Sequence, residues 1–310
     1  MLRWNRQAAN VYPVLPLKTI DRSAREIAVI RTVASLRDVL SRERAKGKRI
    51  ALVPTMGALH QGHLSLIRQA RAECEVVVMS LFVNPTQFNE QRDLDAYPRT
   101  EEADVLLAAD AGCDIVFAPS TSEVYRNGFN TTIDVGAIAR PLEGEARGAV
   151  HFRGVATVVA KLFNMVAPHV AYFGQKDAQQ TLVVRQLVRD LDFPVDIRIC
   201  PTVREADGLA MSSRNARLSK DARAQALALI DALRAIDRAI TDGERDASTL
   251  VQLGTMRLHA FGIERRDIDY VAIVDAETLV PVGTIEGTAL VAIAAFVGGI
   301  RLIDNILVTK

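Results

Sequence analysis

The sequence predicts an α/β protein: a doubly wound parallel sheet with helices on both faces, followed by a smaller C-terminal α+β domain. The sheet is predicted by short apolar runs that alternate with segments of helical periodicity from Val29 to Cys200. Each run ends in a polar or proline-containing turn, as a buried strand does. The second domain is predicted because long alanine-rich helical segments replace this alternation after Pro201.

Five apolar runs of strand length occur in the first part of the chain. The run RIALVP is closed by Pro54, and the valine-rich run after it is typical of a strand buried on both faces. The predicted strands are Arg49–Pro54, Glu75–Val83, Asp114–Pro119, Val170–Phe173 and Val195–Cys200.

Helical periodicity fills the intervals between these strands. The segment His63–Cys74 repeats apolar residues at helical spacing, and Thr100 can cap a second helix that ends at Gly112. Two more helices are predicted over residues 154–167 and Asp177–Leu191. The repeated strand–helix order favours a parallel sheet, in which ligands bind beyond the carboxyl ends of the strands.

The C-terminal part has a different pattern. A loop over Val203–Leu218 leads into a predicted helix over Ser219–Thr241, which the Asp242–Gly243 pair ends, and a second helix covers Ser248–Ala260. Three short strands follow, near Asp267–Val274, Thr288–Val297 and Arg301–Val308. We therefore expect a ligand-binding domain over residues 29–202 and a smaller α+β domain over residues 203–310.

Composition narrows the classes of protein. The chain has 310 residues, 49% hydrophobic and 24% charged, which excludes wholesale disorder. The 38 basic and 37 acidic residues leave a net charge of +1, so no nucleic-acid partner is expected. Cys74, Cys113 and Cys200 form no CxxC pair, which excludes a disulfide scaffold and suits a reducing cytoplasm.

No membrane span or export signal is expected. No run reaches the ~18 apolar residues that cross a bilayer. Pro13 and Pro16 interrupt the apolar run Val11–Leu17, whereas a signal peptide has an unbroken apolar centre. We expect residues 1–28 to be a flexible extension of a cytoplasmic protein.

The strongest local motif follows the first predicted strand, where Pro54–His63 reads PTMGALHQGH. His60 and His63 would share one side of a helical turn at the N-terminus of the next helix. Free backbone N–H groups there favour a phosphate, and imidazoles add hydrogen-bond donors. The alternatives are one capping and one surface histidine, or a zinc site, although no third ligand follows at motif spacing.

Two further strand ends carry polar side chains. Asn84–Phe88 offers uncharged amides that suit a polar substrate, although an Asn-Pro turn explains them equally well. The segment Gly174–Gln180 places Lys176 at another helix N-terminus, where a transferred phosphoryl group would be held. Gln180 lies one turn later on the same face. Asp177 can also serve as a plain helix N-cap.

The loop into the second domain holds a third cluster, Met211–Arg214, in which two hydroxyls precede an arginine. Such a cluster can bind an oxyanion and close over a nucleotide, and an ordinary serine-rich capping loop is the alternative. The usual glycine-rich phosphate motifs, GxxxxGK[ST] and GxGxxG, are absent from the sequence. Together the clusters indicate nucleotide activation by in-line attack at phosphorus.

These residues resemble the pantothenate synthetase (pantoate–β-alanine ligase) family of the HxGH nucleotidyltransferase superfamily. The similarity extends from about Val29 to the C-terminus. The motifs that carry it are PTMGALHxGH (Pro54–His63), FVNPTQF (Phe82–Phe88), YPRT (Tyr97–Thr100), FGxKD (Phe173–Asp177), DGLAMSSR (Asp207–Arg214) and RLIDN (Arg301–Asn305).

The resemblance implies a Rossmann-like N-terminal domain, a smaller C-terminal lid and a homodimer. ATP would adenylate pantoate and release pyrophosphate, and the amine of β-alanine would then give pantothenate and AMP. Magnesium would bridge the phosphates, with Asp104 as an acidic neighbour. His60, His63 and Lys176 would be catalytic, with His63 as proton donor, and Lys176 and Arg214 would contact phosphates.

The resemblance also implies the residues that bind each substrate. Gln87 and Gln180 would hold pantoate, with Gln87 also near β-alanine. The ATP site would consist of Met56, Gly57, Ala58, Leu59, His60, Gln61, Gly62, His63, Gly174, Gln175, Lys176, Asp177, Val203, Met211, Ser212, Ser213 and Arg214.

Two departures from the family pattern are visible. Family members usually have a glutamate and an aromatic residue at the positions of Gln175 and Ala178. The family stretch Glu-Gly-x-x-Arg-Pro-x-His-Phe lacks its proline here and is one residue longer, over Glu143–Phe152.

Three other functions remain as alternatives. One is an HxGH adenylyltransferase for a phosphorylated cofactor precursor, which would need a basic pocket in place of the two glutamines. Another is an aminoacyl-tRNA synthetase, for which a near-neutral chain of this length leaves little tRNA-binding surface. The last is a nucleotide sensor without catalysis.

Overall fold

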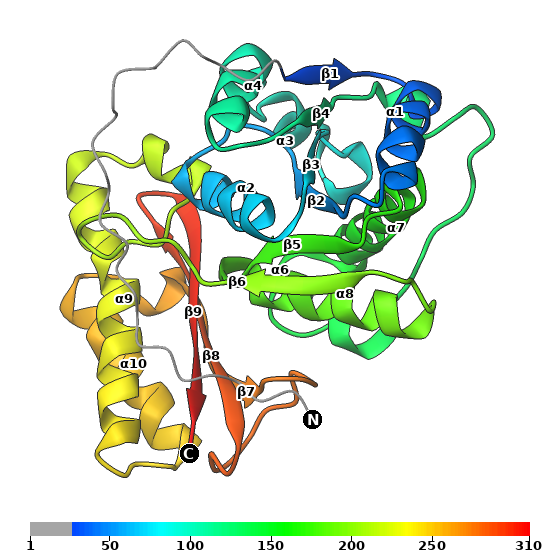
Figure 1. Ribbon diagram of the computed structural model, residues 1–310. Coiled ribbons are helices and arrows are strands. Elements are labelled where there is room, and N and C mark those ends of the chain that lie inside the picture. The colour runs from blue at the N-terminus through cyan, green and yellow to red at the C-terminus, as the bar shows by residue number, and fades with distance from the viewer. Residues whose placement is uncertain (1–26) are drawn as a thin grey trace.

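The computed structural model describes residues 27–310 (Figure 1). The extension predicted over residues 1–28 lies outside the described residues, apart from Ile27 and Ala28. The N-terminal part of the described chain is a six-stranded sheet with the order β1-β4-β3-β2-β5-β6, and all neighbouring strands are parallel. Its strands are β1 (Ala28–Ile30), β2 (Ile50–Thr55), β3 (Val76–Leu81), β4 (Ile115–Phe117), β5 (Val170–Gly174) and β6 (Asp196–Cys200).

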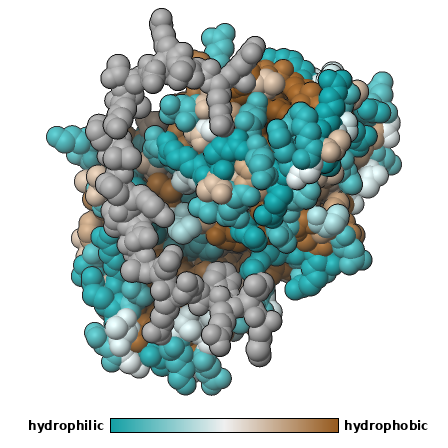
Figure 2. Space-filling view, in the orientation of Figure 1, coloured by the Kyte–Doolittle hydropathy of each residue, from teal (hydrophilic) through white to brown (hydrophobic). Residues whose placement is uncertain are grey.

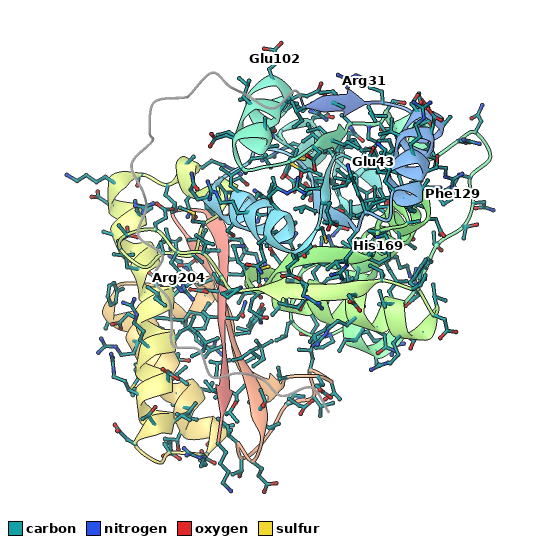
Figure 3. The ribbon with its side chains drawn as sticks, in the orientation of Figure 1. Arg31, Glu43, Glu102, Phe129, His169 and Arg204 are labelled. Carbon is teal, nitrogen blue, oxygen red and sulfur yellow. The ribbon has the colours of Figure 1, made fainter. Side chains whose placement is uncertain are left out.

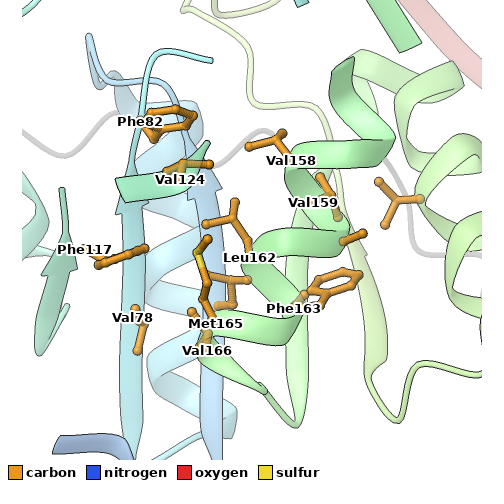
Figure 4. Close-up of a cluster of buried hydrophobic side chains, with 14 of the residues drawn as sticks. Val78, Phe82, Phe117, Val124, Val158, Val159, Leu162, Phe163, Met165 and Val166 are labelled. Atoms are coloured by element: carbon orange, nitrogen blue, oxygen red, sulfur yellow. The ribbon is translucent and has the colours of Figure 1, made fainter. Parts of the chain in front are cut away.

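Helices cover both faces of this sheet (Figure 1). Buried side chains of α2 (Gln61–Glu73) and α4 (Glu101–Asp110) pack on one face, and those of α1 (Val33–Ala45), α7 (Ala149–Val166) and α8 (Ala178–Asp190) pack on the other. Successive strand residues alternate between the two cores, with Val78 in one and Met79 in the other. Figure 4 shows the larger core, in which Leu162 and Met165 of α7 lie on the side of the helix toward Val78 and Phe117.

Short elements complete this part of the chain. They are η1 (Pro85–Gln87), α3 (Gln91–Asp95), α5 (Thr121–Val124), η2 (Gly136–Ala139), α6 (Glu143–Arg147) and η3 (Gln175–Asp177). Several of them lie at the carboxyl ends of strands, where η1 follows β3 and η3 follows β5. They therefore carry the polar segments that the sequence places beyond the strands.

The centre of the sheet is a topological switch point. β2 pairs with β3 on one side and with β5 on the other. The chain returns to the sheet on opposite sides of β2, so the connections after β2 and β5 diverge and leave a crevice at their carboxyl ends. The segments after these two strands, Met56–His63 and Gln175–Gln180, begin at this crevice.

The C-terminal part is a three-stranded antiparallel sheet covered by two helices. Figure 1 shows α9 running alongside this sheet, separate from the parallel one. The elements are η4 (Ser213–Arg217), α9 (Lys220–Thr241), α10 (Ala247–Ala260), η5 (Arg265–Asp267), β7 (Ile268–Asp275), β8 (Thr288–Val297) and β9 (Ile300–Thr309).

The surface is mainly polar on the face that Figure 2 shows, with smaller apolar areas between the hydrophilic residues. Among the helices of residues 27–310, none is long and apolar enough to cross a bilayer. The three cysteines are buried and unpaired, in agreement with the absence of a disulfide scaffold.

The predicted fold class is confirmed, and the differences are local. Strand β1 and helices α1, α3, α5 and α6 are not among the predicted elements, and α7 begins at Ala149 instead of residue 154. Gly154 lies inside α7, where a Cβ atom would come within 2.4 Å of the Thr86 carbonyl oxygen. Glycine is thus required here by close packing between α7 and η1, and it does not mark the start of the helix.

Candidate active site

The turn between β2 and α2 has an unusual backbone. Gly57 and Ala58 both have positive φ, at 88° and 51°. Asp104 of α4 holds this turn, because its carboxylate accepts hydrogen bonds from the N–H groups of Ala58 (3.0 Å) and Leu59 (2.8 Å). The Thr100 hydroxyl donates to the same carboxylate at 3.0 Å.

Asp104 shapes the turn after β2. Its side chain is buried, with 2% of the residue exposed, and both oxygens accept hydrogen bonds. Its expected place as an acidic neighbour of magnesium stays a prediction.

His60 and His63 form a reciprocal cap at the start of α2. Nδ1 of His60 accepts the N–H of Gly62 at 3.2 Å, and Nδ1 of His63 accepts the N–H of His60 at 3.4 Å. The ring centroids are 4.2 Å apart. Since Nδ1 is the acceptor in both neutral rings, the proton of each is on Nε2.

This arrangement corrects one expectation. The backbone N–H groups of Gly62 and His60 are taken by the imidazoles and are not available to a phosphate. An anion at the end of α2 would meet two Nε2–H donors instead. Gly62 makes this possible, because a Cβ there would lie 2.8 Å from Cε1 of His60.

Both histidines are neutral at pH 7. Burial, and after it the Lys176 charge, lower the pKa of His60 to about 4. Burial lowers the pKa of His63 to about 3, with His60 as the next cause. The pair therefore supplies hydrogen-bond donors, and positive charge in the site must come from other residues.

Gln87 is held by a buried amide network at the end of β3. Asn84, 1% exposed, donates through Nδ2 to Oε1 of Gln87 (3.1 Å) and to the Gly154 carbonyl (3.2 Å). Its Oδ1 accepts the Tyr125 hydroxyl at 2.8 Å. The Gln87 amide reaches Sδ of Met56 at 2.8 Å, which places η1 beside the turn after β2.

Helix α7 packs against η1. His151 Nδ1 lies 2.9 Å from the Gln87 carbonyl oxygen, which can only accept, so Nδ1 carries the proton. Burial lowers the pKa of His151 to about 4. The neutral imidazole and the close contact at Gly154 together fix the backbone of Gln87.

Lys176 lies in η3, directly after β5. Its Nζ is 3.7 Å from Oδ1 of Asp177, and its side chain is 17% exposed. Asn305 of β9 holds this turn, because its Nδ2 donates to the carbonyls of Gln175 (3.1 Å) and Lys176 (2.8 Å). Nε2 of Gln175 returns a hydrogen bond to Oδ1 of Asn305 at 3.2 Å.

The loop after β6 forms a narrow hairpin over residues 203–211, and its last residue, Met211, lies beside the start of α2. Val203 and Met211 are joined by a backbone hydrogen bond of 3.0 Å. Cβ of Met211 is 3.8 Å from the position that a Cβ on Gly62 would take. Ser212 then caps η4 by accepting the N–H of Arg214 at 3.2 Å.

Arg214 is a partly buried cation, and its guanidinium has no hydrogen-bonded partner among residues 27–310. Burial lowers its pKa, and the charge of Arg147 is the second cause. Because Arg147 is already paired with Glu143, Arg214 is the cation that an anion here would meet. Tyr97 of the YPRT motif is also near, since the Arg214 charge acts on its hydroxyl.

Glu143 of α6 connects this helix to β7 and β9 of the C-terminal sheet. Its carboxylate accepts hydrogen bonds from Arg147 (2.8 Å), Arg301 (2.7 and 2.9 Å) and the Tyr270 hydroxyl (3.0 Å). Burial raises the pKa of Glu143, but the hydrogen bonds and charges of the two arginines outweigh it and lower the pKa to about 2.

The structure brings the predicted clusters to one place. Electrostatic interactions join His60 to Lys176, Asp177 and Glu205, and Lys176, Ser212 and Arg214 line one pocket between the two sheets. Gln180 lies in the first turn of α8, and no hydrogen bond of its side chain is recorded within the described part of the chain. The roles expected for these residues stay predictions.

Several residues of the site had not been identified from the sequence. Asn84 lies in the FVNPTQF motif, where the sequence predicts either an amide for a polar substrate or a turn, and its hydrogen bond to Gln87 is not predicted. Asp304 and Asn305 lie in the RLIDN motif without an assigned role, and two of the three partners of Glu143 are 127 and 158 residues away in the chain. No local pattern reports contacts over such separations.

Magnesium fits this site only together with phosphate groups. Within residues 27–310, no three His, Cys, Asp or Glu side chains are grouped so that they could hold a metal ion. Mg²⁺ keeps several waters and takes one or two carboxylates in addition to substrate phosphates. Asp177, whose side chain is 51% exposed beside Lys176, offers one such carboxylate.

Comparison with protein families finds a match over almost the whole described chain. The family model described as pantoate-beta-alanine ligase matches residues 28–307. The pantothenate synthetase of Acidobacterium capsulatum is 51% identical over 293 residues, covering 92% of this chain and 96% of that protein. That of Thermotoga neapolitana is 50% identical over 277 residues, covering 89% and 98%.

Solved structures agree with these matches. Pantothenate synthetase from Thermus thermophilus has a TM-score of 0.84 at 46% identity, covering 90% of this chain and 99% of that one. A pantoate-beta-alanine ligase from Francisella tularensis, solved in complex with beta-gamma ATP and beta-alanine, has a TM-score of 0.75 at 32% identity. That match covers 91% of this chain and 98% of the other.

Proposed function

The chain belongs to the pantoate–β-alanine ligase family, and we propose that it makes pantothenate through a bound pantoyl adenylate, releasing AMP and pyrophosphate. Ligase activity follows from the family itself. The intermediate, the products and the residues that handle them are the proposal. The gathering of neutral imidazoles, partly buried cations and uncharged amides at one crevice supports it.

The first step joins pantoate to the α-phosphorus of ATP. A carboxylate oxygen of pantoate forms a bond to this phosphorus, and the bond to the bridging oxygen of pyrophosphate breaks. In the second step the β-alanine nitrogen attacks the acyl carbon and loses a proton. The bond from carbon to the AMP oxygen then breaks, and an amide is formed.

Charge on the phosphates would be met by residues from three segments. Lys176 and Arg214 supply the positive charge, because both histidines are neutral before ATP binds. Nε2–H groups of His60 and His63 donate to phosphate oxygens, where negative charge raises the pKa of an imidazole. In this way His63 becomes able to donate a proton as the pyrophosphate leaves.

The remaining ATP contacts are proposed from the family pattern and from position in the crevice. They are Met56, Gly57, Ala58, Leu59, Gln61, Gly62, Gly174, Gln175, Asp177, Val203, Met211, Ser212 and Ser213. Magnesium would bind chiefly to the phosphates and waters, with Asp177 as the available carboxylate, and would supply charge neutralisation.

Pantoate would be held by Gln87 and Gln180, with Gln87 also near β-alanine. Amides can hydrogen-bond to the pantoate carboxylate without forming an ion pair with it, so the carboxylate oxygen stays nucleophilic. The Asn84 network fixes the orientation of Gln87, since Asn84 Nδ2 donates to Oε1, and Nε2, which donates one hydrogen to Sδ of Met56, keeps a second hydrogen for pantoate. Gln87 thus lies near the atoms that react.

Three further expectations are kept as proposals. Residues 29–202 would form the nucleotide- and pantoate-binding domain, and residues 203–310 a lid that closes over ATP. The family also suggests a homodimer in the cytoplasm. Sedimentation of the purified protein tests the dimer, and a monomer at micromolar concentration would contradict it.

The decisive experiment follows products of a mixture of ATP, pantoate and β-alanine. We expect AMP and pyrophosphate to appear in step with pantothenate. β-Alanine should also speed up AMP release from ATP and pantoate, which a nucleotide sensor would not show. Formation of ADP in place of AMP would contradict the mechanism.

A substitution tests the role of the histidine pair. His63→Ala should lower pantoate-dependent exchange of pyrophosphate into ATP by about 10²–10⁴-fold, the usual contribution of a general acid. His259→Ala is the matched control, because the hydrogen bond of His259 goes to the Ile263 carbonyl at the end of α10. An unchanged exchange rate in His63→Ala would remove the proposed role.

A further inference from the structure

Two adjacent polar residues of β9 are buried. Asp304 and Asn305 of β9 are 3% and 5% exposed. Successive side chains of a strand point to opposite faces, so burial of both requires a separate polar partner on each side. Both partners belong to segments of the candidate active site.

Asp304 holds the hairpin after β6. Its two carboxylate oxygens accept a bidentate pair of hydrogen bonds from Arg204, at 2.6 and 3.0 Å. The same guanidinium donates to the Gly208 carbonyl at 3.2 Å, across the hairpin. Figure 3 shows Arg204 in the loop beside β9. This hairpin continues directly into Met211–Arg214.

Asn305 holds the turn that carries Lys176. Its amide makes three hydrogen bonds to Gln175 and Lys176, two of them to consecutive carbonyls. The Asn305 N–H also donates to Oδ1 of Asp304 at 2.8 Å, so the two side chains are linked through one peptide unit. The backbone of Lys176 is therefore fixed relative to the same peptide as Arg204.

We propose that Asp304 and Asn305 are positioning residues that set the distance between Lys176 and Arg214 around the ATP phosphates. The proposal rests on the proposed function. Phosphoryl transfer depends mainly on the placement of charge, and displacement of a charged group by about 1 Å can cost 10²-fold in rate. Lys176, Arg214 and Asp304 line one pocket, so a shift of β9 is transmitted to both cations.

The test compares both half-reactions in Asp304→Asn and Asn305→Asp. Each variant keeps the size of the side chain, but the first loses the charge opposite Arg204 and the second loses both donors to η3. We expect kcat/KM for ATP in pyrophosphate exchange to fall about 10²-fold. KM for pantoate should stay close to that of the wild type.

Aminolysis of supplied pantoyl adenylate separates positioning from general damage. This substrate lacks the β- and γ-phosphates, so it depends less on the spacing of the two cations, and we expect β-alanine to react with it at nearly the wild-type rate. An equal loss in both half-reactions, or no loss in either, would overturn the proposal. Arg204→Lys offers a milder variant, because it keeps the charge but not the bidentate geometry.

The control and the ATP affinity complete the design. Asp231→Asn removes the partner of Arg257 between α9 and α10, at 2.7 Å, and should leave both half-reactions unchanged. ATP affinity by calorimetry should fall in the β9 variants and not in this control. If the wild type showed no pantoate-dependent exchange, the proposed function would fail, and the affinity measurement would still decide whether β9 positions the phosphate-binding residues.

Discussion

Replacement of Gly154 by alanine tests how the helix α7 positions Gln87. A Cβ at this position would lie 2.4 Å from the Thr86 carbonyl oxygen, 2.6 Å from its carbon and 2.7 Å from the Gln87 nitrogen. Ordinary contacts begin at about 3.4 Å, so α7 and η1 must separate by about 1 Å. All three atoms belong to the backbone and cannot move aside by a rotamer change.

Two effects on stability compete in this variant. Alanine in place of glycine inside a helix gains about 1 kcal/mol. Overpacking against rigid neighbours costs about 1–3 kcal/mol, and the hydrogen bond from Asn84 to the Gly154 carbonyl is also strained. We expect a net loss of about 2 kcal/mol in the free energy of unfolding, measured by urea denaturation.

The effect on catalysis should exceed the effect on stability. Displacement of Gln87 by about 1 Å should lower kcat/KM for pantoate by about 10²-fold in pyrophosphate exchange, while KM for ATP changes little. Gly254→Ala in α10 is the matched control, because its nearest neighbour is Cδ1 of Ile236, the end of a flexible side chain, at 2.8 Å. Wild-type kcat/KM for pantoate in Gly154→Ala would refute the reasoning.

Three other predictions concern charge and protonation. The free energy of unfolding should fall as the pH drops from 6.5 to about 4, by up to ~1.4 kcal/mol per pH unit for each of His60 and His63. The reason is that the unfolded chain takes up protons that the buried rings do not. A urea-unfolding free energy that does not change over this pH range would contradict this. Asp104→Asn should lower the free energy of urea unfolding by about 1–3 kcal/mol, because it leaves a backbone N–H unsatisfied. The dependence of activity on magnesium concentration should stay unchanged. A rise in the magnesium concentration that activity requires would make Asp104 a ligand. Glu143→Gln should lower the free energy of unfolding by about 3 kcal/mol at pH 7, since Arg147 and Arg301 lose a buried charged partner. A thermal midpoint equal to that of the wild type would show that the Glu143 cluster does not stabilise the fold.

The fold was largely predictable because its strands are short, apolar and bounded by turns. Strands β2 to β6 coincide with the predicted runs to within a few residues. Helix α1 was missed although Val33, Leu36 and Leu40 are buried at helical spacing, so its signal was present in the sequence. The predicted start of α7 at residue 154 was wrong, since Gly154 lies inside the helix and contacts η1, and no local pattern reveals that contact.

The site was predictable where the chemistry is local. His60 and His63 are neighbours on one turn, and their spacing alone indicated a shared function. Their neutrality could not be predicted, because it follows from burial between segments distant in sequence. The same holds for Asp304, whose partner Arg204 lies 100 residues away.

The order of the segments along the chain has a consequence for synthesis on the ribosome. A nascent chain that has emerged as far as Arg214 already carries the two histidines, both glutamines proposed to hold pantoate and both cations proposed to contact phosphates. It still lacks β9, on which η3 and the following hairpin are anchored. Domains fold as they emerge, so the parallel sheet can form early while the candidate active site stays unassembled until the RLIDN segment is translated.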